Sequence, residues 1–168
     1  MVRNHFILIL SLLVISCNTP VRMSDVAGGV AAVGFERSDI TEYPGSCFLQ
    51  GVSEYAREAS DAALRARLTE TLDRFRDGGL VGRGSLISYC IGGTAMAEQA
   101  LWGNDSYTEV VTAVADSMFR TQPRNTDGLM IPAWDRDNIR PDGAFIDLIF
   151  GVTPFFLYAG LLDRKSVV

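Results

Sequence analysis

Asp147 is the residue whose chemistry most needs an explanation, because it is the single acid inside an otherwise apolar stretch, residues 143–162. An ionised carboxylate in an apolar helix is costly unless it is paired, hydrogen-bonded or facing a wet cavity. Such surroundings also raise a carboxyl pKa, which suits a proton donor. We therefore predict that Asp147 faces a cleft near the start of a buried helix. The structural alternative is that it caps this helix or pairs with Arg140.

Composition excludes several other kinds of site. The chain has 168 residues, of which 48% are hydrophobic, and a net charge of −5. The acidic balance argues against a nucleic-acid partner, because phosphate binding requires a basic surface. The single histidine, His5, lies in the N-terminal segment, which excludes histidine-based metal sites and nucleophilic triads from the rest of the chain. We expect no metal and no cofactor, and chemistry that depends on carboxylates, Arg, Tyr and Trp.

Cysteine usage adds little chemistry to this picture. Cys47 and Cys90 are far apart in the sequence and form no CxxC motif, so no redox or metal motif is present. We expect both to be buried thiols. A disulfide between them is the open alternative in an exported protein.

The elements that position Asp147 are predicted to be helices. Apolar residues recur at helical spacing along most of the chain, and no convincing run alternates with the period of a strand. Residues 26–39 form a weaker helix candidate or a loop. The clearer predicted helices cover residues 46–58, 61–77, 87–101, 107–120 and 143–162. The sequence therefore predicts an all-α fold.

Turn and cap residues separate these predicted helices. Adjacent glycines at 92 and 93 interrupt the helix over 87–101, and such pairs often mark close packing or the approach of a ligand. The remaining expected signals are a turn at 43–45, an N-cap at Ser60, a stop at 78–79 and a cap at Asp105 or Ser106.

Two classes of helix alternate along the chain. The helices over 61–77 and 105–119 are amphipathic, whereas those over 46–58, 87–101 and 143–162 are more apolar and contain glycine. Alternation of amphipathic outer helices with apolar inner helices is what an α/α toroid requires, because the inner ring is covered on both sides. We expect the inner helices to line a central cleft.

The N-terminal segment is typical of an exported lipoprotein. Arg3 provides a basic start, residues 6–15 form an apolar run of signal-peptide length, and Cys17 follows an aliphatic stretch and a small residue. This arrangement resembles a bacterial lipobox, in which Cys17 is lipidated. An ordinary cleaved signal with an incidental cysteine is the alternative. We predict a periplasmic or outer-membrane lipoprotein whose contact with a membrane is only through this lipid anchor.

A series of short motifs follows in order along the chain. They are the Gly pair at 92–93, Gly-Asn-Asp at 103–105, Phe-Arg-Thr-Gln-Pro-Arg at 119–124, Thr-Asp-Gly-Leu at 126–129, Phe-Ile-Asp at 145–147 and Pro-Phe-Phe at 154–156. In these motifs the chain resembles the unsaturated uronyl hydrolases, glycoside hydrolase families 88 and 105. The resemblance extends over about residues 46–162 and is strongest in the last forty of these.

This resemblance implies an (α/α)6 barrel and a reaction. The family removes a terminal 4,5-unsaturated uronic acid from the oligosaccharides that polysaccharide lyases produce. An Asp protonates the vinyl ether double bond and activates the water that hydrates it, and the product then collapses and releases the sugar. By matched position this Asp is Asp147. The implied partner is an unsaturated uronic-acid oligosaccharide.

The chain also departs from the family. The family has a second Asp just before the Gly pair, but residues 88–91 of this chain contain no acid. The family loop also carries an aromatic residue and a His after its Gly, where this chain has Leu129, Met130 and Ile131. Trp134, Arg136 and Arg140 are the substitutes we expect, since an aromatic ring stacks on a sugar and Arg holds a carboxylate. The alternative is that both arginines pair with the loop acids Asp135, Asp137 and Asp142.

Length limits the resemblance to part of a barrel. Twelve helices need well over about 300 residues, so we expect a partial (α/α)6 barrel truncated at its C-terminal side. The expected organisation is a signal peptide at 1–16, a tether and N-terminal segment at 17–42, a partial catalytic domain at 43–162 and a non-native tail at 163–168.

Two other functions remain open. A non-catalytic α/α lipoprotein that binds a glycan or a partner would explain the missing second Asp and His. Another α/α-barrel glycosidase would need a second acid near Asp147, for which Asp135, Asp137 and Asp142 are candidates.

Overall fold

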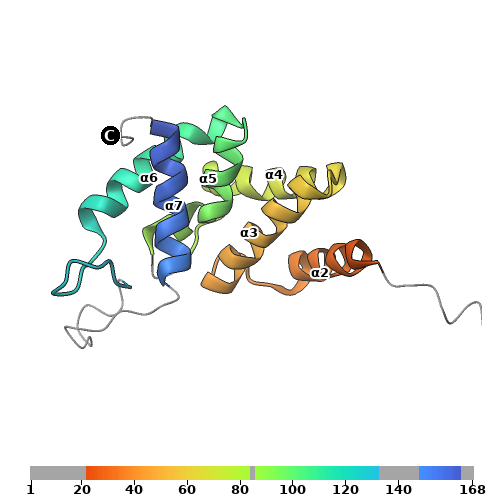
Figure 1. The fold of residues 1–168 in the computed structure, drawn as a ribbon, viewed down its shortest axis with the longest axis horizontal. Coiled ribbons are helices and arrows are strands. Elements are labelled where there is room, and N and C mark those ends of the chain that lie inside the picture. Colours follow the sequence, from red (N-terminus) through yellow and green to blue (C-terminus); the bar gives the residue numbers. More distant parts are fainter. Residues whose placement is uncertain (1–21, 84–85, 133–147, 164–168) are drawn as a thin grey trace, which may run out of the picture.

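A computed structural model describes residues 22–83, 86–132 and 148–163, and the side chains of 148–150 are not described. Within these ranges the chain is all-helical and contains no strand (Figure 1). The all-α prediction is therefore confirmed. None of the helices in the described ranges is long and apolar enough to cross a membrane.

The elements follow the predicted order, with shifted boundaries. They are α2 (Met23–Arg37), α3 (Tyr43–Glu58), α4 (Ala62–Arg76), the 3₁₀ turn η1 (Ile87–Ile91), α5 (Thr94–Leu101), the 3₁₀ turn η2 (Asp105–Tyr107), α6 (Thr108–Thr121) and α7 (Leu148–Asp163). The weak candidate over 26–39 is a helix that begins three residues earlier, inside the segment expected to be a tether.

The start of α3 corrects the turn expected at 43–45, because these residues form the first turn of the helix. Pro44 is tolerated there because the first helical N–H groups have no intrahelical acceptor. Gly45 is required by packing: a Cβ at this position would collide with the backbone of Asp39 and Ile40. A Tyr-Pro-Gly sequence that is typical of a turn therefore begins a helix here.

Helix α4 has the predicted core face but a different cap. Asp61 is its N-cap, and the Asp61 carboxylate accepts a hydrogen bond of 2.9 Å from the backbone N–H of Leu64. Ser60, the expected cap, lies one residue earlier with a positive φ of 53°. Gly78 ends the helix region with φ of 75°, as the glycine signal predicts. The predicted core residues Leu64, Leu68, Leu72 and Phe75 are all buried.

The glycine pair interrupts the third predicted helix as expected. Gly92 and Gly93 have φ values of 82° and 66°, so η1 ends and α5 begins at this point. Both positions are also tightly packed: a Cβ on Gly93 would lie 3.3 Å from Ser46 Oγ, and one on Gly92 would lie 3.0 Å from Leu72 Cδ2. The pair therefore satisfies a backbone requirement and a packing requirement together.

The turn before α6 also differs from its prediction. No side chain caps α6, and Asp105 and Ser106 instead belong to the 3₁₀ turn η2. Tyr107 ends this turn fully buried, and its hydroxyl donates hydrogen bonds to Asp73 Oδ1 (3.0 Å) and to the Thr69 carbonyl (3.3 Å). The entry to α6 is thus held by a buried tyrosine and not by a cap.

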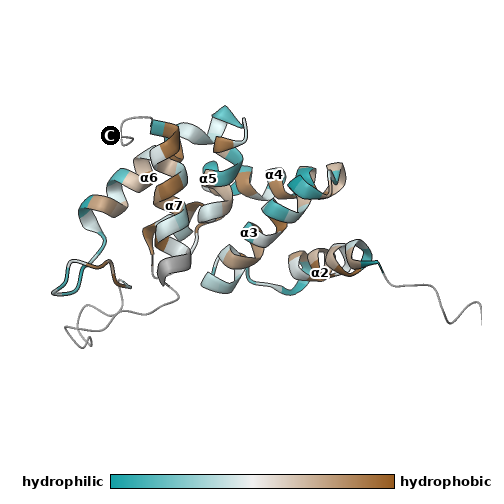
Figure 2. Cartoon of the chain, in the orientation of Figure 1, coloured by the Kyte–Doolittle hydropathy of each residue, from teal (hydrophilic) through white to brown (hydrophobic). Residues whose placement is uncertain are grey.

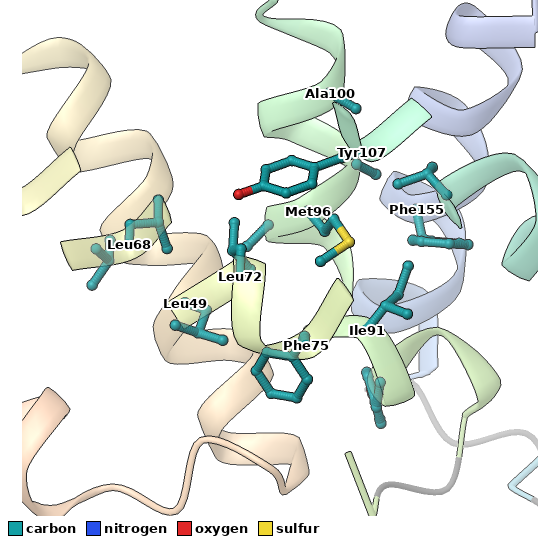
Figure 3. Close-up of a cluster of buried hydrophobic side chains, with 14 of the residues drawn as sticks. Leu49, Leu68, Leu72, Phe75, Ile91, Met96, Ala100, Tyr107 and Phe155 are labelled. Atoms are coloured by element: carbon teal, nitrogen blue, oxygen red, sulfur yellow. The ribbon is translucent and has the colours of Figure 1, made fainter. Parts of the chain in front are cut away.

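The helices pack around α5, which contacts α3 on one side and α7 on the other (Figure 1). Helix α4 packs on α3, and α6 packs on α5, α7 and η1. Figure 3 shows the resulting core, in which Met96 of α5 meets side chains from the surrounding helices. Fully buried members of this core are Leu49, Leu68, Leu72, Met96, Tyr107, Val111, Met118 and Phe155.

Apolar side chains also remain exposed at the two ends of this helical array. On α2, Met23 and Val30 are exposed, and on α7, Leu157 and Leu161 are exposed. Figure 2 shows hydrophobic residues on both helices. Helix α7 therefore buries one face, which includes Phe155 and Ala159, and leaves the other uncovered by the described residues.

Candidate functional site

The site residues expected from the sequence lie outside the described part of the chain. These residues are Cys17, Trp134, Arg136, Arg140 and Asp147. Asp147 directly precedes Leu148, the first residue of α7, in the sequence. The structure therefore does not decide whether these residues come together, and the described residues must be examined for sites of their own.

A small cavity lies where α3, η1, α5 and α7 meet near their N-terminal ends. Its volume is about 10 Å³, which is at the lower limit for one water molecule. The aromatic rings of Tyr43 and Tyr89 border it, with centroids 5.9 Å apart and planes tilted by 44°. We call this the helix-start cavity, and its lining residues are Tyr43, Ser46, Cys47, Gln50, Tyr89, Thr94 and Gly151.

Glycine at position 151 shapes this cavity. A Cβ there would collide with the hydroxyl of Tyr89 and with Cδ1 of Leu86. Because no side chain occupies this position, α7 approaches η1 closely enough for Tyr89 to pack against its backbone. The cavity is therefore narrow because of glycine packing, and its polar lining comes from hydroxyl, thiol and amide groups.

The loop over residues 123–131, which follows α6, is held by its own hydrogen bonds. Asn125 Oδ1 accepts from the backbone N–H groups of Asp127 (3.1 Å) and Leu129 (2.8 Å), and Gly128 adopts φ of 82°. The Arg124 guanidinium donates to the carbonyls of Gly128 (2.8 Å) and Phe119 (3.2 Å). Arg124 therefore closes the loop.

Gln122 fastens the same loop to η1. The buried Gln122 amide donates to the Ile131 carbonyl at 2.6 Å, and its Oε1 accepts from the backbone N–H of Ile87 at 3.1 Å. Since η1 also carries Tyr89, this amide links the loop to the helix-start cavity. It is a structural support that the sequence patterns did not indicate.

Glu98 is the most unusual ionisable residue in the described part of the chain. Its side chain is fully buried in α5, and no described group lies in hydrogen-bonding geometry with either carboxylate oxygen. Burial is the main cause that raises the pKa of Glu98 to about 7; the nearby Glu54 carboxylate contributes to the rise, whereas Ser53 and Tyr158 oppose it. This carboxyl group is therefore poised between its two protonation states near neutral pH.

The residues around Glu98 come from three helices. Ser53, which is fully buried in α3, accepts a hydrogen bond of 3.0 Å from the side-chain amide of Gln99. Glu54, also in α3, pairs with Arg57 at 3.0 Å. Tyr158 reaches the group from α7, and burial together with the two glutamates raises the pKa of its hydroxyl. We call Ser53, Glu54, Glu98 and Tyr158 the Glu98 cluster.

Arg57 connects this cluster to the protein surface. Its guanidinium lies 4.4 Å from the centre of the Trp102 ring and also pairs with Glu58 at 2.7 Å. Arg57 is about half exposed, so its pairs are screened by solvent. The Glu98 cluster is thus buried at Glu98 and Ser53 and reaches solvent at the Glu54–Arg57 ion pair.

A carboxyl group with these properties can hold or release a proton near neutral pH, as a general acid or base must. Sequence reasoning missed Glu98, although it lies in the apolar run Ala95–Leu101, as Asp147 lies in its own apolar stretch. Glu98 and Asp147 share one sequence pattern, a single acid among mainly apolar residues. Only the contacts with Glu54 and Tyr158 could not have been read from the sequence.

The two cysteines of the described chain are free, and no disulfide joins them. The prediction of buried thiols is wrong for Cys47, which is exposed on α3 at the border of the helix-start cavity. Cys90 is partly buried, and burial raises the pKa of its thiol. No group of three or more metal-ligating side chains occurs within the described ranges.

Two larger grooves lie on the outside of the helical array. One, of about 520 Å³, runs between α6 and α7 and is bordered by Glu109, Asp116, Phe119 and Phe156. The other, of about 280 Å³, runs between α2 and α3 and is almost wholly apolar, with Val30 and Phe48 in its walls. Neither groove contains Glu98 or a residue of the Glu98 cluster.

Comparisons with protein-family models, with curated proteins and with solved structures give no match to this chain. The function must therefore be argued from the chain's own residues. These form an all-helical array with a narrow cavity at the starts of α3, α5 and α7. Further along α5 lies the buried Glu98, whose pKa is raised to about 7.

Proposed function

We propose that this chain is part of a glycoside hydrolase of the unsaturated uronyl hydrolase type, with a partial (α/α)6 barrel as its fold. The observation that carries the proposal is the packing of α5 between α3 and α7, with α4 and α6 packed against them. In an α/α toroid, inner helices pack side by side and outer helices cover them from one side. The central position of α5, whose residues are almost all buried, agrees with an inner helix.

The proposed reaction hydrates the double bond of a terminal unsaturated uronic acid. Asp147 donates a proton to the vinyl ether and activates the attacking water, and the hydrated product collapses and releases the shortened oligosaccharide. Trp134 stacks on the sugar, and Arg136 and Arg140 hold the uronate carboxylate by charge-assisted hydrogen bonds. No cofactor takes part. The chain would act as a lipid-anchored bacterial protein through Cys17, at the periplasmic or outer membrane.

The helix-start cavity supports this assignment indirectly. It gathers the starts of three candidate inner helices, and Leu148 at the start of α7 directly follows Asp147 in the sequence. The lining groups Tyr43, Gln50 and Thr94 are hydroxyls and an amide, which are suited to hydrogen-bonding sugar hydroxyls. The support lies in this neighbourhood and in the resemblance of residues 119–156 to the family.

The test is loss of the ultraviolet absorbance of the unsaturated uronyl group when the purified chain, without residues 1–16, is incubated with lyase-generated oligosaccharides. We expect Asp147→Asn to lower the rate by about 10³-fold, since removal of a general acid costs about 10²–10⁴. Asp116→Asn on the exposed side of α6 is the matched carboxyl-to-amide control and should retain the parent rate. Equal rates for the parent and Asp147→Asn would contradict the assigned role.

A non-catalytic binding protein is the second candidate, and the two outer grooves favour it. The α2–α3 groove and the α6–α7 groove present Phe48, Phe119 and Phe156 to possible partners. A folded chain that binds the oligosaccharides in calorimetry but leaves their absorbance unchanged would select this candidate. Turnover of any uronyl oligosaccharide would exclude it.

A further inference from the structure

The inference concerns the interface of α5 with α3 and α7, where Glu98 lies, and it does not depend on the proposed enzymatic function. The Glu98 side chain has no exposed surface, and neither of its oxygens has a hydrogen-bond partner among the described groups. An isolated carboxylate in such a position costs far more than a neutral carboxylic acid. Something must therefore neutralise this group when the helices are packed.

The surrounding charges do not supply the neutralisation. From α3, Glu54 adds a second negative charge, and the positive charge of Arg57 is already paired with Glu54 and Glu58. From α7, Tyr158 offers a neutral hydroxyl. The turn η2 and helix α6 also pack on α5; their charged groups are Asp105, Glu109, Asp116 and Arg120, and Asp116 and Arg120 pair with each other at the surface. A proton is the occupant that these surroundings favour.

We propose that Glu98 must be protonated for α5 to pack against α3 and α7, and that loss of this proton to solvent loosens the interface. The packed form holds Glu98 as a neutral acid that can donate one hydrogen bond towards Glu54. When Glu98 ionises, two carboxylates face each other beside the buried Ser53, and their repulsion and hydration favour separation of the helices. The chain then has a pH-sensitive contact at the centre of its fold.

Separation of the helices at Glu98 would also affect the helix-start cavity. Thr94 precedes Glu98 by one helical turn on α5 and lines the helix-start cavity. On a helix, positions four residues apart lie on one face, so the cavity and Glu98 lie along the same side of α5. Separation of α5 from α3 and α7 would extend the narrow cavity towards Glu98 and admit water.

The sign of the pH dependence follows from the raised pKa. The folded-state pKa of Glu98 lies at about 7 and the ordinary value at 4.5, so the folded chain binds this proton more strongly than the unfolded chain. The stabilisation is complete below about pH 4.5 and is lost as the pH rises to about 7. The equilibrium constant for folding should fall by about two orders of magnitude across this window.

The first experiment is urea unfolding of the parent chain, Glu98→Gln and Glu58→Gln at a series of pH values from 4.5 to 8. Glutamine keeps the shape of the neutral acid, so Glu98→Gln should remove most of the fall in stability and exceed the parent at pH 8. Glu58→Gln is the matched control, because Glu58 pairs with Arg57 as Glu54 does but is largely exposed. It should retain the parent profile. An unchanged pH slope in Glu98→Gln would overturn the proposal.

A second measurement reports the local contact and does not require denaturant. In a Trp134→Phe background, Trp102 is the only tryptophan and lies against Arg57 beside the cluster. Its fluorescence in the folded chain should change with a midpoint near pH 7, and the change should be absent when Glu98→Gln is added. A pH-independent signal in the parent would contradict a loosening of this interface.

Two further outcomes are decisive. If Ca²⁺ stabilises the parent but not Glu98→Gln at pH 8 in a saturable way, a cation and not a proton is the natural occupant, and the proposal fails. If Glu98→Gln does not fold, the proposal is tested by measuring the protons that the parent chain releases on unfolding. At pH 6, unfolding should release about one proton from Glu98. No release would overturn the proposal.

Discussion

The helix-start cavity and the Glu98 cluster lie along the same three helices, but their polar groups are accommodated in different ways. At the helix starts, glycine at 93 and 151 lets the backbones approach, and hydroxyls such as that of Ser46 fill the remaining space. Further along, a full glutamate side chain is enclosed without a hydrogen-bond partner. The first region packs closely because its residues are small, whereas the second encloses a carboxyl group that favours the protonated form.

The two regions depend on different physical properties, volume in the first and charge in the second. Close backbone packing at the helix starts is sensitive to volume, and no Asp, Glu or His is among the described residues that line the helix-start cavity. A buried, unpaired carboxyl is sensitive to pH and tolerant of a neutral side chain of the same shape. The two regions can therefore be separated by experiment, since volume changes should damage the first and charge changes should act on the second.

The largest expected effect is on volume at the helix starts. Gly151→Ala places a Cβ against the Tyr89 hydroxyl and Leu86, and we expect it to lower the free energy of unfolding by about 2–3 kcal/mol at every pH, as overpacking does. Chemical unfolding at pH 5 and pH 8 measures this. Gly51→Ala, also within a helix but with open space around it, should stabilise by about 0.5–1 kcal/mol. Equal effects at both positions would show that the Tyr89 contact does not constrain Gly151.

A smaller effect is expected in the cluster from Ser53→Ala. The variant removes the acceptor of the Gln99 amide and a neighbouring polar hydroxyl that favours the ionised form of Glu98. We expect a loss of about 1 kcal/mol at pH 5, where Glu98 is neutral, and a larger loss at pH 8 because the pKa of Glu98 rises further. Ser46→Ala, at the helix starts, is the comparison and should cost the same at both pH values.

The smallest expected effect comes from the solvated edge of the cluster. Arg57→Gln removes the pairs with Glu54 and Glu58 and the contact with the Trp102 ring. Exposed pairs contribute little, so we expect a change below about 1 kcal/mol that decreases further in high salt. Thermal unfolding at two salt concentrations measures it. A salt-independent loss of several kcal/mol would show that Arg57 neutralises the cluster more directly than its exposure implies.

Local patterns predicted much of the helical architecture. The apolar spacing of Leu64, Leu68, Leu72 and Phe75 predicted the buried face of α4, and the glycines at 92 and 93 predicted the break before α5. These predictions succeed because helical periodicity and left-handed glycine conformations are properties of neighbouring residues. The expected site residues, from Trp134 to Asp147, lie outside the described residues, so their roles stay predictions.

Each error concerns a choice between local alternatives that residue type alone does not settle. Tyr43-Pro44-Gly45 is compatible with a turn and with a helix start, and the approach of Asp39 and Ile40 accompanies the helix. The general behaviour of thiols predicts a buried Cys47, but its position on α3 leaves it exposed. Asp61 and not Ser60 caps α4 because its carboxylate reaches the Leu64 N–H.

Residue spacing within single segments was enough to predict the helical class, the break at the glycine pair and the core face of the amphipathic helices. Tertiary structure alone decided that Glu98 meets Glu54 and Tyr158, which belong to other helices. It also decided that Gly151 packs against Tyr89. The physical reason is that the cost of a buried charge depends on every group around it in space, and these groups are brought together only when α3, α5 and α7 pack.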